Sequence, residues 1–101
     1  MQIRLAGGAA ALDVGASSPG RWREEPPRTW ERETAPGVAR VRAAGRLLKI
    51  DGEIVSGAAV RFVPADGLFH LGDSVYRGEL VVRLEANGTL RATEQVALED
   101  Y

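Results

Sequence analysis

Two adjacent carboxylates are the residues most suited to acid–base chemistry: Glu99 and Asp100, which stand between Leu98 and Tyr101. Cleavage of a glycosidic bond needs a carboxyl group with a raised pKa, and a hydrolase adds a second carboxylate on the other side of the bond. Consecutive side chains diverge along a strand or round a helix, so Glu99 and Asp100 cannot flank one bond. We expect a local structural role instead, because acidic side chains at the start of a helix interact favourably with its exposed amides and the positive end of its dipole.

The other reactive side chains form no catalytic pattern. His70 is the single histidine and lies between two apolar residues, a setting typical of a hydrogen-bonded strand residue rather than of a base or a ligand. The absence of cysteine excludes thiolate metal sites and disulfides. No serine lies in a nucleophile elbow or an S-x-x-K pattern, and no glycine-rich phosphate loop is present. These residues therefore predict no catalytic residue, no metal site and no cofactor.

Four aromatic residues could contact a sugar ring: Tyr76, Tyr101, Trp22 and Trp30. The alternative for the tyrosines, which we favour, is a buried ring whose hydroxyl forms a hydrogen bond. For the tryptophans we favour a solvated loop whose two indoles cover the edge of a sheet.

Length and charge narrow the class of protein. With 101 residues the chain is expected to form one domain. Its 13 Lys and Arg balance 14 Asp and Glu, which argues against a nucleic-acid binder, because phosphate neutralisation needs unopposed cations. No run approaches the ~18 apolar residues of a membrane span. The amino-terminal sequence MQIRLAGGAAALDVG lacks the apolar stretch of a secretory signal, so we expect neither a span nor a signal peptide.

The sequence predicts that strands carry these side chains, because period-two alternation of apolar and polar residues dominates and no stretch favours a helix of ordinary length. Alternation predicts an opening pair of strands at 2–6 and 11–15, followed by strands at 38–43, 46–50, 53–55, 59–64, 68–71, 74–76, 79–85 and 89–98. Residues 17–37 break the pattern, since eight of the thirteen residues from Arg21 to Glu33 are charged and Pro26-Pro27 lies among them. We expect a loop there.

Three Asx-Gly pairs predict tight turns: Asp51-Gly52, Asp66-Gly67 and Asn87-Gly88. The third gives the best hairpin, because Leu80, Val82, Leu84, Leu90 and Ala92 would share one face. The predicted fold is mainly β, with short antiparallel strands and hairpins that form a small barrel-like or sandwich half-domain.

The last third of the chain carries a resemblance to a known family. The residues that carry it are Tyr76, Arg77, Gly78 and Leu80, followed by Leu98, Glu99, Asp100 and Tyr101. This order resembles the stage II sporulation protein D (SpoIID/LytB-type) family, whose members have a Y-R-G-x-L-x-V strand, a β-hairpin and an L-P-L-E-D-Y-L segment that opens a helix. The match covers residues 48–101 and is weaker over 2–14. Ala97 stands where the family usually has proline.

The resemblance implies work on the peptidoglycan of the cell wall, outside the cytoplasmic membrane. The family includes lytic transglycosylases, which cleave denuded glycan strands, and amidase enhancers, with a role in sporulation where spores form. Its catalytic glutamate lies on the helix that follows the L-E-D-Y segment, and so beyond Tyr101.

We therefore expect residues 1–101 to be the amino-terminal β portion of such a domain. It would comprise a Pro/Trp/charge-rich loop at 17–37 and a hairpin-rich core at 38–101, without the carboxy-terminal helices and inactive alone. Glycan strands and the missing carboxy-terminal half would be its partners, and Val96 and Leu98 would lose their cover. The alternative is a self-sufficient β module that binds a glycan or a protein without catalysis.

Overall fold

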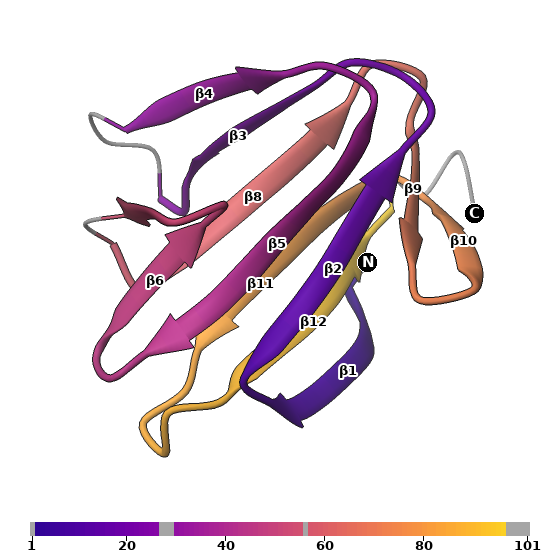
Figure 1. Cartoon of the computed structure of the whole chain (residues 1–101). Helices are drawn as coiled ribbons and strands as arrows, with labels where there is room; N and C mark the ends of the chain where they lie inside the picture. Colours follow the sequence, from indigo (N-terminus) through magenta and orange to yellow (C-terminus); the bar gives the residue numbers. More distant parts are fainter. Residues whose placement is uncertain (1, 27–29, 56, 97–101) are drawn as a thin grey trace.

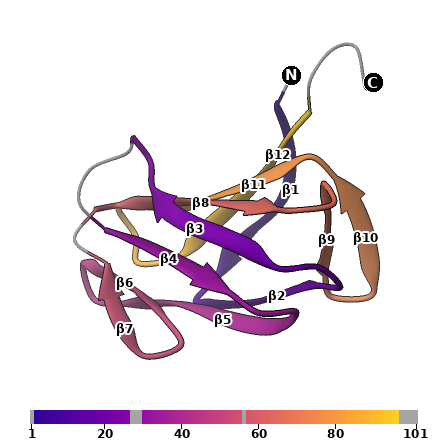
Figure 2. The same ribbon diagram turned by 90° about the horizontal axis from the view of Figure 1, so that it is seen from above.

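The computed structural model is a sandwich of two antiparallel six-stranded sheets (Figures 1 and 2). It describes residues 2–26, 30–55 and 57–96. The described chain is all strand, turn and bend, which confirms the mainly β class. The two sheets remain separate instead of closing into a barrel, so the sandwich is the correct one of the two predicted architectures.

The first sheet, here sheet A, has the strand order β1-β12-β11-β8-β3-β4. These strands are β1 (Gln2–Ala9), β12 (Leu90–Gln95), β11 (Glu79–Leu84), β8 (Ala59–Pro64), β3 (Gly20–Glu24) and β4 (Glu31–Thr34). Sheet B has the order β10-β9-β2-β5-β6-β7. Its strands are β10 (Ser74–Arg77), β9 (Leu68–Leu71), β2 (Ala11–Ala16), β5 (Gly37–Ala44), β6 (Leu47–Ile50) and β7 (Glu53–Val55).

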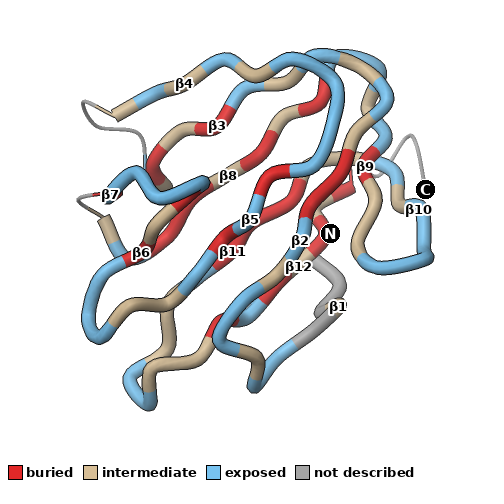
Figure 3. Tube along the Cα trace, viewed as in Figure 1, coloured by how far each residue is buried: buried red, intermediate tan, exposed pale blue. Residues whose placement is uncertain are grey.

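The core lies between the sheets and is built from alternate residues of the strands (Figure 3). Its largest fully buried apolar side chains are Trp22, Phe69, Leu48, Ile50, Leu80 and Leu90, which come from both sheets. Each such side chain contributes roughly 1.5 to 3 kcal/mol on burial, so the interface between the sheets is the main source of stability.

Two of the three predicted hairpin turns are confirmed. Asn87-Gly88 joins β11 to β12, and four of the five residues predicted to face inward there are buried: Leu80, Val82, Leu90 and Ala92. Asp51-Gly52 joins β6 to β7, with positive φ at both residues.

The Asp66-Gly67 pair forms a tight turn but not a hairpin. It leads from β8 in sheet A to β9 in sheet B, so the flanking strands do not pair with each other. A carboxylate oxygen of Asp66 accepts hydrogen bonds from the Leu68 amide (3.0 Å) and the Ser18 hydroxyl (2.9 Å). An Asx-Gly pair thus specifies the local reversal, whereas the sheet that the next strand joins depends on packing.

The predicted opening pair of strands is wrong in its pairing. Both strands exist, but β1 pairs with β12 in sheet A and β2 pairs with β5 and β9 in sheet B. The chain crosses from one sheet to the other at Ala10, and Gly8 has φ 83° near the end of β1. Alternation predicted the strands but carries no information on their partners.

The predicted loop at 17–37 is also wrong, because β3 and β4 form a hairpin within it and β3 pairs with β8 as well. The period-two pattern was present but hidden: Trp22 and Glu24 face inward while Arg21 and Arg23 face outward. A buried glutamate and the nearby prolines masked that signal. Trp22 packs in the core against Phe62, with ring centroids 4.8 Å apart.

The expected loss of cover over the last strand is not seen at Val96, which is buried. Leu98 lies outside the described residues.

Candidate functional site

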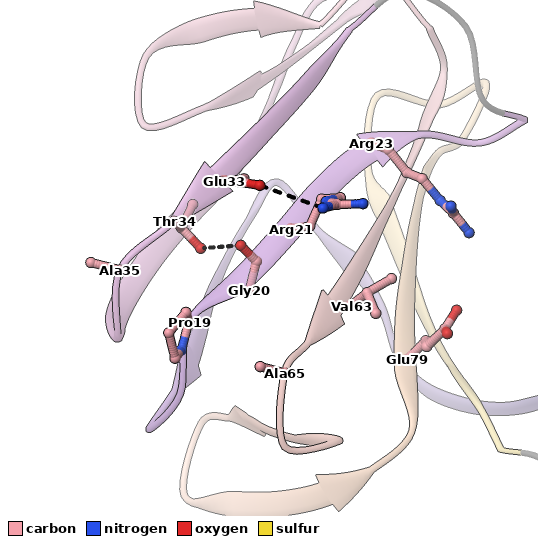
Figure 4. A pocket seen from close by; sticks show the side chains of 10 residues that line it. All are labelled: Pro19, Gly20, Arg21, Arg23, Glu33, Thr34, Ala35, Val63, Ala65 and Glu79. Atoms are coloured by element: carbon pink, nitrogen blue, oxygen red, sulfur yellow. Dashed lines mark hydrogen bonds and ion pairs between the residues drawn. The ribbon is translucent and has the colours of Figure 1, made fainter.

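A groove of about 720 Å³ lies on the outer face of sheet A, across β4, β3, β8 and the start of β11 (Figure 4). Small residues create the hollow: Pro19, Ala35 and Ala65 lie at one end, and Gly20 and Val63 lie along it. Longer polar side chains surround them, namely Arg21, Arg23, Glu33, Thr34 and Glu79. The groove therefore combines an apolar base with a charged rim.

Arg21 occupies the β4 side of the groove and is held by two carboxylates. Its guanidinium lies 2.9 Å from Glu31 and 3.4 Å from Glu33, both on the paired strand β4. All three side chains are at least half exposed, so these ion pairs contribute only about 0 to 1 kcal/mol each. Their effect is to orient Arg21 and Glu33 along the rim.

Arg61 fixes the opposite end of the groove. Its guanidinium contacts Glu25, lies 2.6 Å from Glu79 and donates a 3.1 Å hydrogen bond to the Gln95 side chain. Burial opposes the positive charge of Arg61, but the hydrogen bonds to Glu79 and Glu25 outweigh it, so the pKa of Arg61 is raised further above its ordinary value. The contact with Arg61 thereby orients the Glu79 side chain at the groove.

Arg23 is the donor that the groove leaves available. Among the described residues it forms no ion pair, and its Nε atom is buried without an acceptor. Glu31, opposite Arg23 on β4, is bound by Arg21 instead. A buried donor without a partner costs free energy. The Arg23 side chain also lines the groove, where its charge is available to a ligand oxygen. Glu33 and Glu79 supply hydrogen-bond acceptors, and the small residues supply an apolar base. The groove therefore suits a neutral ligand that has hydroxyl or amide groups as well as small apolar groups.

The predicted motif residues Tyr76 to Gly78 form a corner where the chain passes from sheet B to sheet A. Gly78 has φ 111°, and its amide donates a 2.7 Å hydrogen bond to the Gly67 carbonyl. The Arg77 amide donates to the buried Glu94 carboxylate at 3.1 Å. This bend needs glycine, because φ is positive and the backbone of Gln95 approaches closely.

The predicted aromatic sugar contacts have different outcomes. Trp22 has no exposed surface, so its proposed contact with a sugar is wrong: the pairing of β3 with β8 places the indole between the sheets. Trp30 is half-buried, and its indole nitrogen donates a 2.8 Å hydrogen bond to Glu53. Tyr76 is half-buried and stacks on Phe69, with centroids 5.5 Å apart. Trp30 and Tyr76 therefore keep some ring surface available.

The carboxylate motif Leu98 to Tyr101 lies outside the described residues. His70 is a β9 strand residue opposite Val75 and Gly15, in agreement with the strand position predicted for it. Within the described residues no group of three or more histidine and acidic side chains could hold a metal ion.

The groove itself was not predicted from the sequence. Arg21, Arg23 and Glu33 lie in the region expected to be a loop, and Glu79 and Val63 lie on strands whose neighbours were unknown. Small residues beside charged ones form a groove only after the strands pair.

Fold and site together define a two-sheet β-sandwich with an open, polar-rimmed groove on one outer face. Comparison with models of protein families, with curated proteins and with solved structures gives no significant match. Among the residues searched, none belongs to a helix long and apolar enough to cross a membrane.

Proposed function

We propose that residues 1–101 form the amino-terminal β portion of a SpoIID/LytB-type domain that acts on peptidoglycan, and that this portion supplies scaffold rather than the proton donor. The support comes from the sequence resemblance and from the contact between the Y-R-G corner and the end of β12.

One observation carries the proposal: the Y-R-G corner packs directly against the strand that leads into the L-E-D-Y segment. A Cβ atom added to Gly78 would lie 2.4 Å from the Gln95 carbonyl oxygen and 3.4 Å from the Val96 Cα. Glu79 and Gln95 are paired across β11 and β12. The Y-R-G corner and the end of β12 are thus neighbours in the fold, although they are distant in the sequence.

In this proposal, the scaffold and the catalytic acid belong to different parts of the domain. A lytic transglycosylase needs a carboxyl group that protonates the leaving oxygen, and the sugar's own 6-hydroxyl can act as nucleophile. The resemblance assigns that acid to the helix after Tyr101. Residues 1–101 would hold the start of this helix in place through the corner at Gly78.

The test compares two products of the reading frame. Residues 1–101 alone should release no soluble glycan fragments from purified, peptide-free glycan strands. A product continued through the in-frame codons that follow Tyr101 should release fragments and lose this activity when the first glutamate of the added helix is changed to glutamine. Release by residues 1–101 alone would overturn the proposal, and so would a continued product without such a glutamate.

A second candidate function, a module that binds glycan without cleaving it, is favoured by Arg23, which lines the groove and forms no ion pair with any described residue. Sedimentation with purified cell-wall sacculi tests it. We expect Arg23→Gln to reduce the bound fraction by about tenfold, the loss expected for a hydrogen bond from a charged donor. The matched control is Arg83→Gln, which removes the same charge from an exposed position on β11 outside the groove. Equal binding by both variants and the wild type would rule this function out.

A further inference from the structure

Three cations on one hairpin of sheet B have no ion-pair partner among the described residues: Arg42 on β5, Arg46 in the turn and Lys49 on β6. Arg42 and Lys49 stand directly opposite each other in the strand pairing. Both face outward, because the residues that alternate with them, Val41, Leu48 and Ile50, are buried. Like charges directly opposite each other destabilise a strand pair, so this arrangement is unfavourable without a partner.

The surroundings leave this charge uncompensated. The acidic side chains closest in the strand pairing are engaged elsewhere: Asp13 lies 2.9 Å from Arg40, and Asp51 lies 2.8 Å from Arg32. Five other arginines of the described chain each contact a carboxylate: Arg21, Arg32, Arg40, Arg61 and Arg91. The hairpin is therefore a local excess of positive charge on a protein whose formal net charge is -1.

Exposed aliphatic side chains lie among these cations. Leu47 is 43% exposed and Ile54 is 54% exposed. Ile54 is opposite Lys49 on the neighbouring strand β7, and Leu47 faces the same side of β6 as Lys49. This end of sheet B faces the viewer in Figure 1 and is largely exposed in Figure 3. We call Arg42, Arg46, Lys49, Leu47 and Ile54 the basic–aliphatic patch.

We propose that the basic–aliphatic patch binds the surface of an anionic lipid bilayer. Such a surface supplies negative headgroups for the three cations and an apolar boundary for the two aliphatic side chains, whereas a soluble acidic polymer supplies only the charge. The patch is outside the groove, and the proposal does not depend on the cell-wall function.

The expected binding is weak and sensitive to salt. Each basic residue near an anionic membrane contributes roughly fivefold to partitioning, and the effect falls off within a Debye length. Removal of two cations should therefore weaken binding by about 25-fold.

The experiment is co-sedimentation of the 101-residue chain with vesicles of phosphatidylglycerol and phosphatidylcholine in equal parts. We expect binding that Arg42→Gln with Lys49→Gln nearly abolishes. The matched control, Arg77→Gln with Arg83→Gln, removes the same charge from two exposed residues outside the patch and should leave most of the binding. Leu47→Ser with Ile54→Ser should weaken binding while both cations remain.

Three outcomes would overturn the proposal. One is no binding by the wild type or equal binding to pure phosphatidylcholine. Another is equal weakening by the two charge variants, which would indicate a general effect of net charge. The third is full binding by the Leu47→Ser, Ile54→Ser variant together with competition by soluble poly-glutamate, which would identify an acidic polymer as the partner. The vesicle experiment involves no glycan, so a negative result would overturn membrane binding without bearing on the proposed cell-wall function.

Discussion

Two separate features of the structure require glycine at position 78. Its φ is 111°, a value that residues with a Cβ atom rarely adopt. A Cβ atom added to Gly78 would also lie only 2.4 Å from the carbonyl oxygen of Gln95. A flexible side chain could move aside, but a backbone carbonyl in a paired strand cannot move without breaking hydrogen bonds. Both constraints come from the corner between the sheets.

We expect Gly78→Ala to lower the free energy of unfolding by about 2 to 4 kcal/mol, since backbone strain and a steric clash add. Urea denaturation measures this change. The matched control is Gly88→Ala, where φ is 82° but no atom lies within 4 Å of the added Cβ, so about 1 kcal/mol is expected. Equal losses for the two variants would show that the contact with Gln95 is not rigid.

Asp66 links the acidity of one side chain to the stability of the turn. The Leu68 amide and the Ser18 hydroxyl donate to its carboxylate, and together they hold the pKa of Asp66 below its ordinary value of 3.8. Because the folded-state pKa is depressed, the stabilisation is complete above the unfolded value and is lost as pH falls through the folded value.

We expect the melting temperature to fall as the pH is lowered below about 4, and to fall less in Asp66→Asn, whose amide oxygen can still accept from Leu68 but does not titrate. Thermal melts of the wild type and the variant between about pH 6 and about pH 2.5 would measure this difference in melting temperature. Asp13, whose pKa is lowered by its hydrogen bond to Arg40, should keep part of the acid sensitivity in the variant. Identical pH profiles for wild type and variant would contradict the assignment.

At the scale of elements, sheet A is held together on its outer face by polar contacts as well as by its strand ladders. Arg61 on β8 connects Glu79 on β11, Gln95 on β12 and Glu25 after β3, so one guanidinium joins three strands and a loop. Its side chain is 15% exposed, which places the cluster between a surface ion pair and a buried one. Removal of the cation would leave Glu25 and Glu79 as uncompensated neighbouring carboxylates.

We expect Arg61→Met to lower the free energy of unfolding by about 1 to 3 kcal/mol, since broken pairs cost up to about 5 kcal/mol only when fully buried. Addition of Glu79→Gln to this variant should restore part of the loss, because one of the unpaired charges is removed. Arg83→Met on β11 is the control and should change stability by less than about 0.5 kcal/mol, because Arg83 is exposed. An additive double variant would mean that Arg61 and Glu79 are not coupled.

At the scale of the whole molecule, one core unites the two sheets. The buried cluster includes Trp22 and Leu80 from sheet A and Phe69 and Leu48 from sheet B. Each sheet buries its apolar face against the other in this cluster, and domains of this size commonly unfold in a single step.

We therefore expect one cooperative transition in urea, with an m value of about 1 to 2 kcal/mol/M. The variant Trp30→Phe makes the fully buried Trp22 the only tryptophan, so its fluorescence reports on the core. Its transition should coincide with that of far-ultraviolet circular dichroism. Separate midpoints for the two signals would show that one sheet unfolds before the other.

Much of the local structure could be predicted from the residues in order. Alternation located ten strands, and Asp51-Gly52 and Asn87-Gly88 located two hairpins, because side-chain direction and turn geometry depend on residues that are close in the sequence. The strands β3 and β4 were missed, because the inward Glu24 and the prolines nearby resemble the composition of a loop.

Strand partners and sheet membership required the tertiary structure. Strands β1 and β2, like β8 and β9, are adjacent in sequence but belong to different sheets, since pairing is determined by which apolar faces can be buried together. The same long-range pairing buried Trp22 against Phe62, brought Arg23 to the groove without a partner and set Arg42 opposite Lys49. Residues that are close in the sequence do not reveal contacts between distant segments, and the groove and the basic–aliphatic patch are both made of such contacts.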